Sequence, residues 1–303
     1  MTVSYITWRA NMKKNVLKIL ATVFLVVTLC VPCAHAKTDA ASKSKEAILI
    51  VAFGTSVEKA RSSYANVEKQ VKAAFPGQEV RWAWTAHSLL RSGGKDMLSP
   101  QEALAKLATE GTKDVSVLSL HVIPGAEYNN IVRYAAAFEG LPKGLERIHL
   151  APPLLYDTDS MQTVAKTLVK NLPKERKPDD AVLFVGHGTH HPAGVYYPAL
   201  QYYISTLDKN TFIGTVEGDL DLEHATAAMK TQGIKKVWLA PLMTVAGDHA
   251  LNDLFGDEAD SWKQHLAKNG FAVETVRKGL GEYSDLISLW VNGLRNLRES
   301  KKQ

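Results

Sequence analysis

Cysteine is nearly absent from this 303-residue sequence, and its two residues lie close together near the start. Cys30 and Cys33 sit at the end of an apolar run, 19–31, that follows a basic segment and precedes the small residues 34–36. This order is typical of a secretory signal peptide, and Met12 is a second candidate start. An uncleaved anchor is the alternative, although the run is short for a membrane span. Cleavage after residue 36 would remove both cysteines, which excludes a disulfide framework or a thiolate metal site in the mature chain.

A strong excess of either charge is also missing once the signal peptide is set aside. Four of the 36 basic residues and none of the 31 acidic ones lie in the first 36 positions, which leaves 32 against 31 and a net charge of +1. The composition therefore gives no reason to expect nucleic acid binding. After cleavage we expect no stable membrane insertion and a periplasmic location. The remaining 267 residues (303 less 36) allow one large or two modest domains, preceded by a flexible lead-in at 37–46.

Apolar runs of strand length alternate with helical patterns in the first half of the chain. Strands are predicted at 47–53, 79–85, 114–122 and 147–155. The helix after Ser99 is signalled by a capping serine, by Pro100 at the first helical position and by Gly111 at its end. Alternation of this kind predicts a parallel sheet with right-handed crossovers.

The second half repeats the first. "AILIVAFGT" from Ala47 aligns without gaps with "AVLFVGHGT" from Ala181, and "KDVSVLSLHVIPGAEYNN" from Lys113 aligns with "KKVWLAPLMTVAGDHALN" from Lys235. General likeness between βαβ units is the alternative to duplication. We predict an α/β protein with two similar flavodoxin-like domains, 47–155 and 156–303, each with a four-stranded parallel sheet and with a cleft between them. The amphipathic last helix, 285–297, packs back on either domain, including the N-terminal one.

Three metal-competent side chains follow successive strands of the second domain. His187 comes directly after the first strand, Glu217 after the second and His249 after the third, at separations of 30 and 32 residues. Ligands of open parallel sheets bind beyond the carboxyl ends of the strands, so these side chains are expected at one rim. Two imidazoles and a carboxylate suit cobalt, zinc, nickel or iron. The alternative is that each histidine is merely solvated or hydrogen-bonded.

Neighbouring residues support this interpretation. Gly186 and Gly188 flank His187, and Gly247 lies near His249, so a bulky ligand could approach the backbone closely. Asp248 is a candidate either to orient His249 or to supply negative charge beside the metal ligands.

The other histidines are weaker candidates. His190 and His191 are expected in a wet loop with at most a supporting part, and His224 on the surface. His87, His121 and His149 are expected to be structural, although the first two could face the cleft.

The first domain carries different groups at the matching positions. Phe53 stands where the second domain has His187, and Glu127 stands where it has His249. A large flat ligand held between unlike walls would explain the difference, and drift between repeats is the alternative.

The motifs "ILIVAFGTS", "SLHVIPGAEY", "VGHGTHH", "VEGD" and "PLMTVAGDHALND" resemble the anaerobic, class II cobaltochelatases of the cobalamin pathway, which insert cobalt into sirohydrochlorin. The resemblance covers nearly the whole mature chain, and the signal peptide makes it look like the periplasmic variant of sulfate-reducing bacteria. It implies two flavodoxin-like halves with the active site between them. It also implies that His187, Glu217 and His249 bind the metal.

On that reading the catalytic residues are His187, His249 and Glu127, where one histidine doubles as general base and Glu127 assists proton transfer or orients the ring. The backbone N–H groups of Gly54, Thr55 and Ser56, together with nearby arginines, are predicted to hold the carboxylate-rich rim of the substrate, and Glu127 is also predicted to contact the substrate. Iron in place of cobalt and a homo-oligomer are both left open. Some periplasmic members bind haem at an oligomer interface, but no first-domain histidine here is assigned to haem. The rival functions are a non-catalytic carrier of metal or tetrapyrrole and a metal-dependent hydrolase.

Overall fold

The structure, a computed structural model, describes residues 45–92 and 97–300. They belong to one compact unit, Ser44–Gln303. The predicted signal peptide and nearly all of the predicted lead-in lie outside the described residues. Within the described part of the chain, no helix is both long enough and apolar enough to span a bilayer.

The first half is a four-stranded parallel sheet in the order β2-β1-β3-β4. Its strands are β1 (Glu46–Ala52), β2 (Glu79–Trp84), β3 (Asp114–Ser119) and β4 (Arg147–Leu150). Its helices are η1 (Glu58–Arg61), α2 (Ser62–Ala74), α3 (His87–Ser92), α4 (Pro100–Thr109) and α5 (Ala126–Phe138). β1 begins at Glu46, one residue before the predicted domain start.

The second half repeats this arrangement, because its parallel strands have the order β6-β5-β7-β8. The strands are β5 (Ala181–Gly188), β6 (Thr211–Glu217), β7 (Lys236–Pro241) and β8 (Ala272–Thr275). The helices are α6 (Thr158–Lys170), η2 (Pro192–Val195), α7 (Tyr196–Ser205), α8 (Leu222–Thr231), the π-helix η3 (Ala250–Leu254), α9 (Trp262–Lys268), η4 (Leu280–Glu282) and α10 (Ser284–Glu299). The predicted fold class, α/β with two similar four-stranded parallel sheets, is confirmed.

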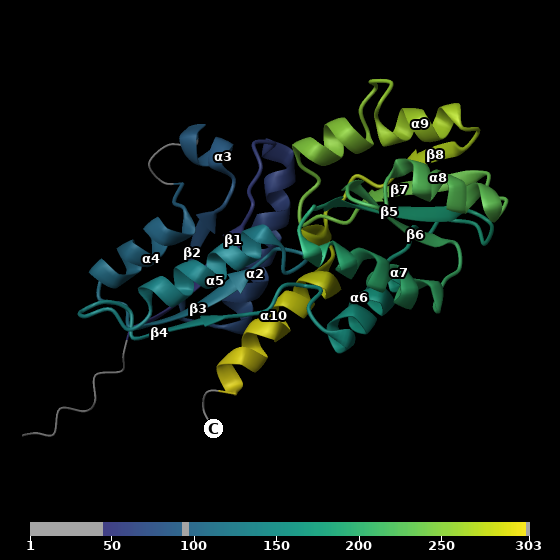
Figure 1. Ribbon diagram of the computed structural model, residues 1–303. Coiled ribbons are helices and arrows are strands. Elements are labelled where there is room, and N and C mark those ends of the chain that lie inside the picture. The colour runs from purple at the N-terminus through teal and green to yellow at the C-terminus, as the bar shows by residue number, and fades with distance from the viewer. Residues whose placement is uncertain (1–44, 93–96, 301–303) are drawn as a thin grey trace, which may run out of the picture. The chain divides into compact units, whose positions relative to one another are not determined.

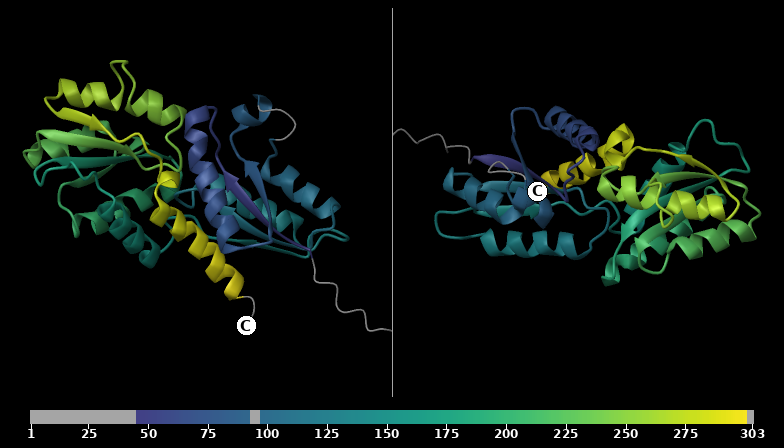
Figure 2. Two further views of the ribbon diagram at one scale, coloured as in Figure 1. Left: turned by 180° about the vertical axis from the view of Figure 1, so that it is seen from behind. Right: turned by 90° about the horizontal axis from the view of Figure 1, so that it is seen from above.

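Local sequence explains where these elements begin. Ser99 accepts a hydrogen bond from the Glu102 N–H while the Glu102 carboxylate accepts one from the Ser99 N–H, which closes a capping box at the start of α4. β1 and β5 are continuous apolar runs because helices cover both faces of each sheet, as Figures 1 and 2 show.

One hydrophobic core joins the two halves. It contains Ile48 and Ile50 from β1, Val182 and Phe184 from β5, and buried side chains of α2, α6, α7 and α10. Separate clusters fill the outer face of each sheet. The carboxyl ends of both sheets are thereby held next to each other, with the loops that follow them free to form a site.

The C-terminal helix α10 packs on the first half, against α2 and β3, and also touches α6. Figure 1 shows it in yellow, lying beside the first sheet. Its buried stripe includes Leu286, Trp290 and Leu294, each at most 3% exposed. Full burial of such side chains stabilises a fold by roughly 1.5–3 kcal/mol each, so the end of the chain fastens the two halves together.

Candidate active site

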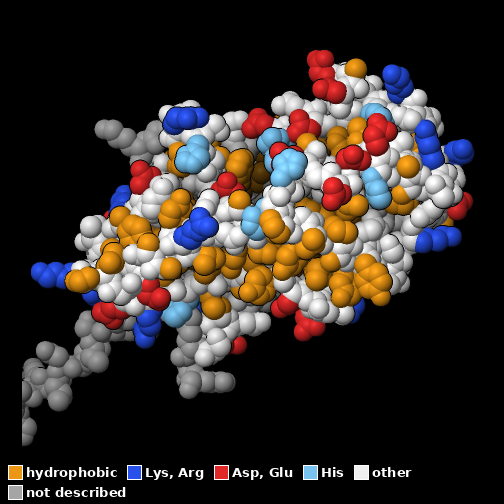
Figure 3. All heavy atoms as spheres, in the orientation of Figure 1, with side chains coloured by type: hydrophobic (Ala, Val, Ile, Leu, Met, Phe, Trp, Pro, Cys, Tyr) orange, Lys and Arg blue, Asp and Glu red, His pale blue; other side chains and the backbone are white. Residues whose placement is uncertain are grey.

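An open cleft of about 570 Å³ lies at the carboxyl ends of the strands and is lined by residues of both halves. This volume falls within the range of about 300–1,000 Å³ that is usual for small-molecule and cofactor sites. Figure 3 shows histidine and acidic side chains gathered at the rim of a hollow whose inside is largely hydrophobic. The cleft is therefore where the predicted site residues have to be sought.

His187 lies near the end of β5 and is half-buried in the cleft wall. Its Nδ1 is 3.3 Å from the carbonyl oxygen of Gly188. Because a carbonyl only accepts, this contact requires the hydrogen to be on Nδ1. The Nε2 atom is then the one with a lone pair available to a metal.

His249 lies on the neighbouring loop and caps the short π-helix η3. Its Nδ1 is 2.9 Å from the Asp253 carboxylate, one turn further along the chain. This contact also places the hydrogen on Nδ1 and leaves Nε2 for a metal. The predicted orienting role of Asp248 is wrong, because Asp248 instead accepts a hydrogen bond from Ser56.

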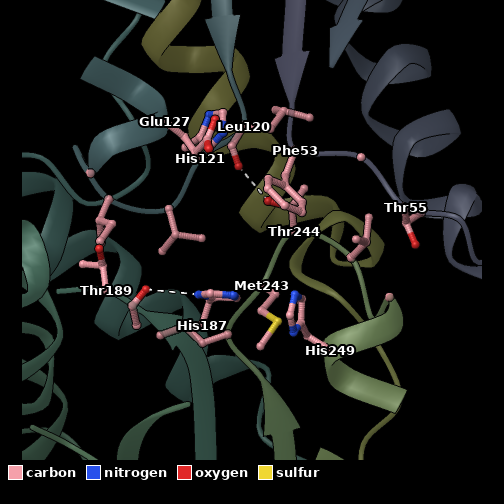
Figure 4. Close-up of a pocket in the computed structure, with 18 of the residues that line it drawn as sticks. Phe53, Thr55, Leu120, His121, Glu127, His187, Thr189, Met243, Thr244 and His249 are labelled. Carbon is pink, nitrogen blue, oxygen red and sulfur yellow. Dashed lines mark hydrogen bonds between the residues drawn. The ribbon is translucent and has the colours of Figure 1, made fainter. Parts of the chain in front are cut away.

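The two imidazole rings meet edge to face, with their centroids 4.7 Å apart and their planes at 87°. Figure 4 shows both rings on the same wall of the cavity. Two neutral imidazoles whose other nitrogens are already anchored are good ligands for a borderline divalent ion such as cobalt, nickel, zinc or iron.

Glu217, the predicted third ligand, ends β6 and is paired in register with Gly188. It lines the same cleft and is exposed. Among the residues that the structure describes, no three His, Cys, Asp or Glu side chains form a ready metal cluster. Glu217 is thus at the rim beside the histidines, and its direct coordination of the metal stays a prediction.

The glycines beside the histidines serve protein packing rather than ligand approach, contrary to the sequence-based interpretation. A Cβ at Gly188, where φ is +80°, would be 1.9 Å from the carbonyl oxygen of Glu217. A Cβ at Gly186 would be 2.4 Å from the Tyr197 ring, and one at Gly247 would be 2.8 Å from the Thr55 hydroxyl. These positions are glycine because backbone and side chains already occupy the space.

A repeated tyrosine contact holds the two strand-end loops. The Gly54 N–H donates to the Tyr64 hydroxyl at 3.2 Å, and the Gly188 N–H donates to the Tyr197 hydroxyl at 3.4 Å. Burial raises the pKa of both tyrosines, to about 12 for Tyr197. The Gly54 N–H is therefore not available to a substrate carboxylate, which corrects its predicted role. The sequence comparison missed this pair because the spacing is ten residues in one half and nine in the other.

The loop after β1 is engaged with the opposite half. The Thr55 hydroxyl is buried and accepts from the Val57 N–H at 3.1 Å. The Ser56 hydroxyl donates to Asp248 at 2.7 Å. The Ser56–Asp248 hydrogen bond connects the two strand-end loops, while the N–H groups of Thr55 and Ser56 as substrate contacts stay a prediction.

His191 is not the wet loop residue that the sequence suggested, although its neighbour His190 is exposed. Its Nδ1 accepts from the Ala193 N–H at 3.1 Å, and its Nε2 lies 3.1 Å from the side-chain amide of Asn129 on α5. His191 therefore caps η2 and connects the two halves across the cleft.

The wall opposite the two histidines carries Phe53, Glu127 and His121, as Figure 4 shows. Phe53 is 46% exposed, which is high for a phenylalanine. Glu127 is half-buried in the first turn of α5. The Nδ1 of His121 is 2.9 Å from the Ser119 hydroxyl, and burial lowers the pKa of His121 to about 4, so its ring is neutral at pH 7. The structure thus places an apolar face and a carboxylate across from the metal-type ligands.

The chain is similar to known proteins over most of its length. Residues 45–299 match the family described as cobalt chelatase (CbiK). A sirohydrochlorin cobaltochelatase, CbiKC, of Nitratidesulfovibrio vulgaris is 37% identical over 254 residues, which cover 83% of this chain and 90% of that protein. The sirohydrochlorin cobaltochelatase of Salmonella typhimurium is 32% identical over 252 residues, covering 82% and 94%.

Solved chelatase structures share the fold at lower identity. SirB from Bacillus subtilis with Fe³⁺ has a TM-score of 0.57 at 16% identity and covers 86% of this chain and 98% of its own. SirB from Bacillus subtilis subspecies spizizenii in complex with cobalt has a TM-score of 0.54 at 15% identity, covering 85% and 97%. With most of its length matched by the family and by two relatives above 30% identity, the chain belongs to the cobalt chelatase (CbiK) family.

Proposed function

We propose that this protein inserts a divalent metal ion, in the first place Co²⁺, into sirohydrochlorin. The observation that carries the proposal is the pair formed by His187 and His249. Each ring has its Nδ1 anchored, to a carbonyl in one case and to a carboxylate in the other, and both line one open cleft. The names of the two relatives supply the substrate and the metal.

Metal insertion exchanges two pyrrole N–H protons for one divalent ion. In this proposal the ion is a substrate, and two histidine Nε2 atoms hold it while leaving positions open for the incoming pyrrole nitrogens. Glu217, at the end of the strand next to His187, adds negative charge at the rim and completes the site when the ion is present. An imidazole that releases the ion can also accept a proton, so one of the two histidines doubles as a base.

The opposite wall would receive the tetrapyrrole. The exposed ring of Phe53 offers a flat apolar surface, and aromatic rings pack face to face with an offset or edge to face. The Glu127 carboxylate lies on the same wall and makes no hydrogen bond or ion pair with any other described residue. It is therefore placed to take a proton from the ring as the metal enters.

The deciding experiment is turnover. The purified protein is mixed with excess sirohydrochlorin and either Co²⁺ or Fe²⁺, and the visible absorbance is followed against the uncatalysed reaction. We expect metallated product to exceed the protein concentration many times over, with Co²⁺ as the preferred ion. An absorbance change that stops at one equivalent of ligand per protein molecule would identify a carrier and refute the chelatase proposal.

We further propose that the protein works in the periplasm. The support is the pattern of the first 36 residues, with its basic start, short apolar run and small residues. Fractionation of the producing cells and sequencing of the mature N-terminus test this. A cytoplasmic protein that still begins at Met1 or Met12 would refute it.

A further inference from the structure

A second, much smaller cavity of about 40 Å³ adjoins the cleft on the side of the first half. It lies among α3, the first turn of α4 and the first half of α5, three helices that Figure 1 shows together around the carboxyl end of β2. Glu127 lines both this cavity and the main cleft. Glu127 therefore borders both the cleft that would hold the substrate and this smaller cavity.

Two buried oxygens in this small cavity lack a partner in the described protein. They are the hydroxyl of Thr85, just after β2, and the side-chain carbonyl of Gln101, in the first turn of α4. Buried polar atoms are nearly always hydrogen-bonded, to ordered water where no protein group is near. One water needs roughly 10–15 Å³ of cavity volume, so a cavity of about 40 Å³ has room for about three waters.

The far end of the cavity reaches the surface. His87, which also lines it, is exposed at the start of α3. Histidine is the side chain that most readily exchanges protons with water near neutral pH. Asn130 and Tyr134 of α5 add further polar groups along the wall. The wall of the small cavity thus carries polar side chains between Glu127 and the exposed His87.

We propose that this cavity is the proton exit of the chelatase, and this inference rests on the proposed function. When the metal displaces a pyrrole proton, the nitrogen keeps its electron pair for the metal and the proton moves to the Glu127 carboxylate. Glu127 then returns to its anionic form by passing the proton to the water held by Thr85 and Gln101, and the proton leaves past His87. One divalent ion enters and two protons leave, so charge and atoms balance over the two deprotonations.

The need for such a route follows from the geometry of the cleft. A flat tetrapyrrole lying against Phe53 covers the Glu127 side of the cleft, and a divalent ion approaches from the other side. A proton left on Glu127 would leave it unable to act as a base again, and the proton cannot leave toward the incoming positive charge. Thr85 and Gln101 act through Glu127, so they are positioning residues rather than catalytic ones.

The test compares steady-state metal insertion by the unchanged protein with insertion by Thr85→Val, which keeps the shape but removes the hydroxyl, and by Gln101→Leu. We expect kcat to fall about tenfold in each, less than the hundredfold or more typical of removing an acid–base group itself. The KM for sirohydrochlorin should not change. Added imidazole buffer should restore part of the rate, and Thr85→Ser should behave like the parent.

Thr112→Val is the matched control. The Thr112 hydroxyl is also buried and has no hydrogen-bond partner among the described residues, but Thr112 lines neither cavity. The proposed proton exit is overturned if both Thr85→Val and Gln101→Leu insert metal at the parental rate with an unchanged solvent isotope effect. It is also overturned if Thr112→Val loses as much rate, or if buffer restores nothing. Failure of the unchanged protein to insert metal would instead overturn the proposed function, and the proposed proton exit with it.

Discussion

Replacing Gly188 by alanine should separate the two strands that present the metal ligands. Gly188 has φ of +80°, a conformation that costs an L-residue roughly 1–2 kcal/mol. In addition, its new Cβ would be 1.9 Å from the Glu217 carbonyl oxygen and 2.9 Å from the Glu217 nitrogen. Since both are backbone atoms, the end of β6 must move, and forced repacking of this kind costs roughly a further 1–3 kcal/mol.

Gly111→Ala provides the matched control for this change. Gly111 has nearly the same φ, +83°, but a Cβ there meets nothing within 4 Å. It should therefore lose only the conformational part, about 1–2 kcal/mol. Urea unfolding should show Gly188→Ala to be the less stable variant by about 1–3 kcal/mol.

The effect on metal binding distinguishes the turn at Gly188 from the ordinary turn at Gly111. Displacement of Glu217 from the strand beside His187 should weaken Co²⁺ binding about tenfold or more by calorimetry, whereas Gly111→Ala should bind as the parent does. Equal stability of the two variants, together with unchanged Co²⁺ affinity, would show that the close contact between the ends of β5 and β6 does not set the metal site.

Two further predictions concern histidines. Asp253→Asn removes the anion that holds His249, so Co²⁺ affinity should fall about 10- to 100-fold, while Asp248→Asn should change it little; the reverse order in calorimetry would contradict the assignment. The pKa of His121 is lowered by burial to about 4, below the value of 6.5 that it has when exposed, so its neutral form stabilises the fold above pH 6.5 and this contribution is lost as the pH falls through 4. The difference between these two pKa values corresponds to ~3 kcal/mol of unfolding free energy. His121→Gln should therefore flatten the decline of unfolding free energy between pH 7 and pH 4, and an equally steep decline in the variant would refute the assignment.

Much of the fold could be predicted because the central strands β1 and β5 are buried apolar runs and the strand order repeats. The rim positions of His187, Glu217 and His249 follow from the rule that ligands bind at the carboxyl ends of parallel strands: His187 and Glu217 lie at the ends of β5 and β6, and His249 lies in the loop after β7. The positions of Phe53 and Glu127 on the opposite wall could also be predicted, because the gapless repeat pairs these residues with His187 and His249.

The remaining features depend on geometry that no spacing reveals. Asp253 reaches His249 only through the one-turn π-helix. Helices of this type are rare in proteins, and those that occur often lie at functional sites. The role of Gly188 depends on the neighbouring strand, which lies 29 residues away in the chain. The contact of His191 with Asn129 joins a loop of the second half to helix α5 of the first half and has no local signal.

The central claim is that His187 and His249 hold the metal during insertion. The most direct measurement is the rate of Co²⁺ insertion into sirohydrochlorin, with Co²⁺ affinity measured in parallel, for His187→Ala, His249→Ala and the exposed helical control His224→Ala. The account predicts that the first two lose about a hundredfold or more in rate, bind Co²⁺ weakly and stay folded, while the control matches the parent. Parental insertion rates in both His187→Ala and His249→Ala would contradict it.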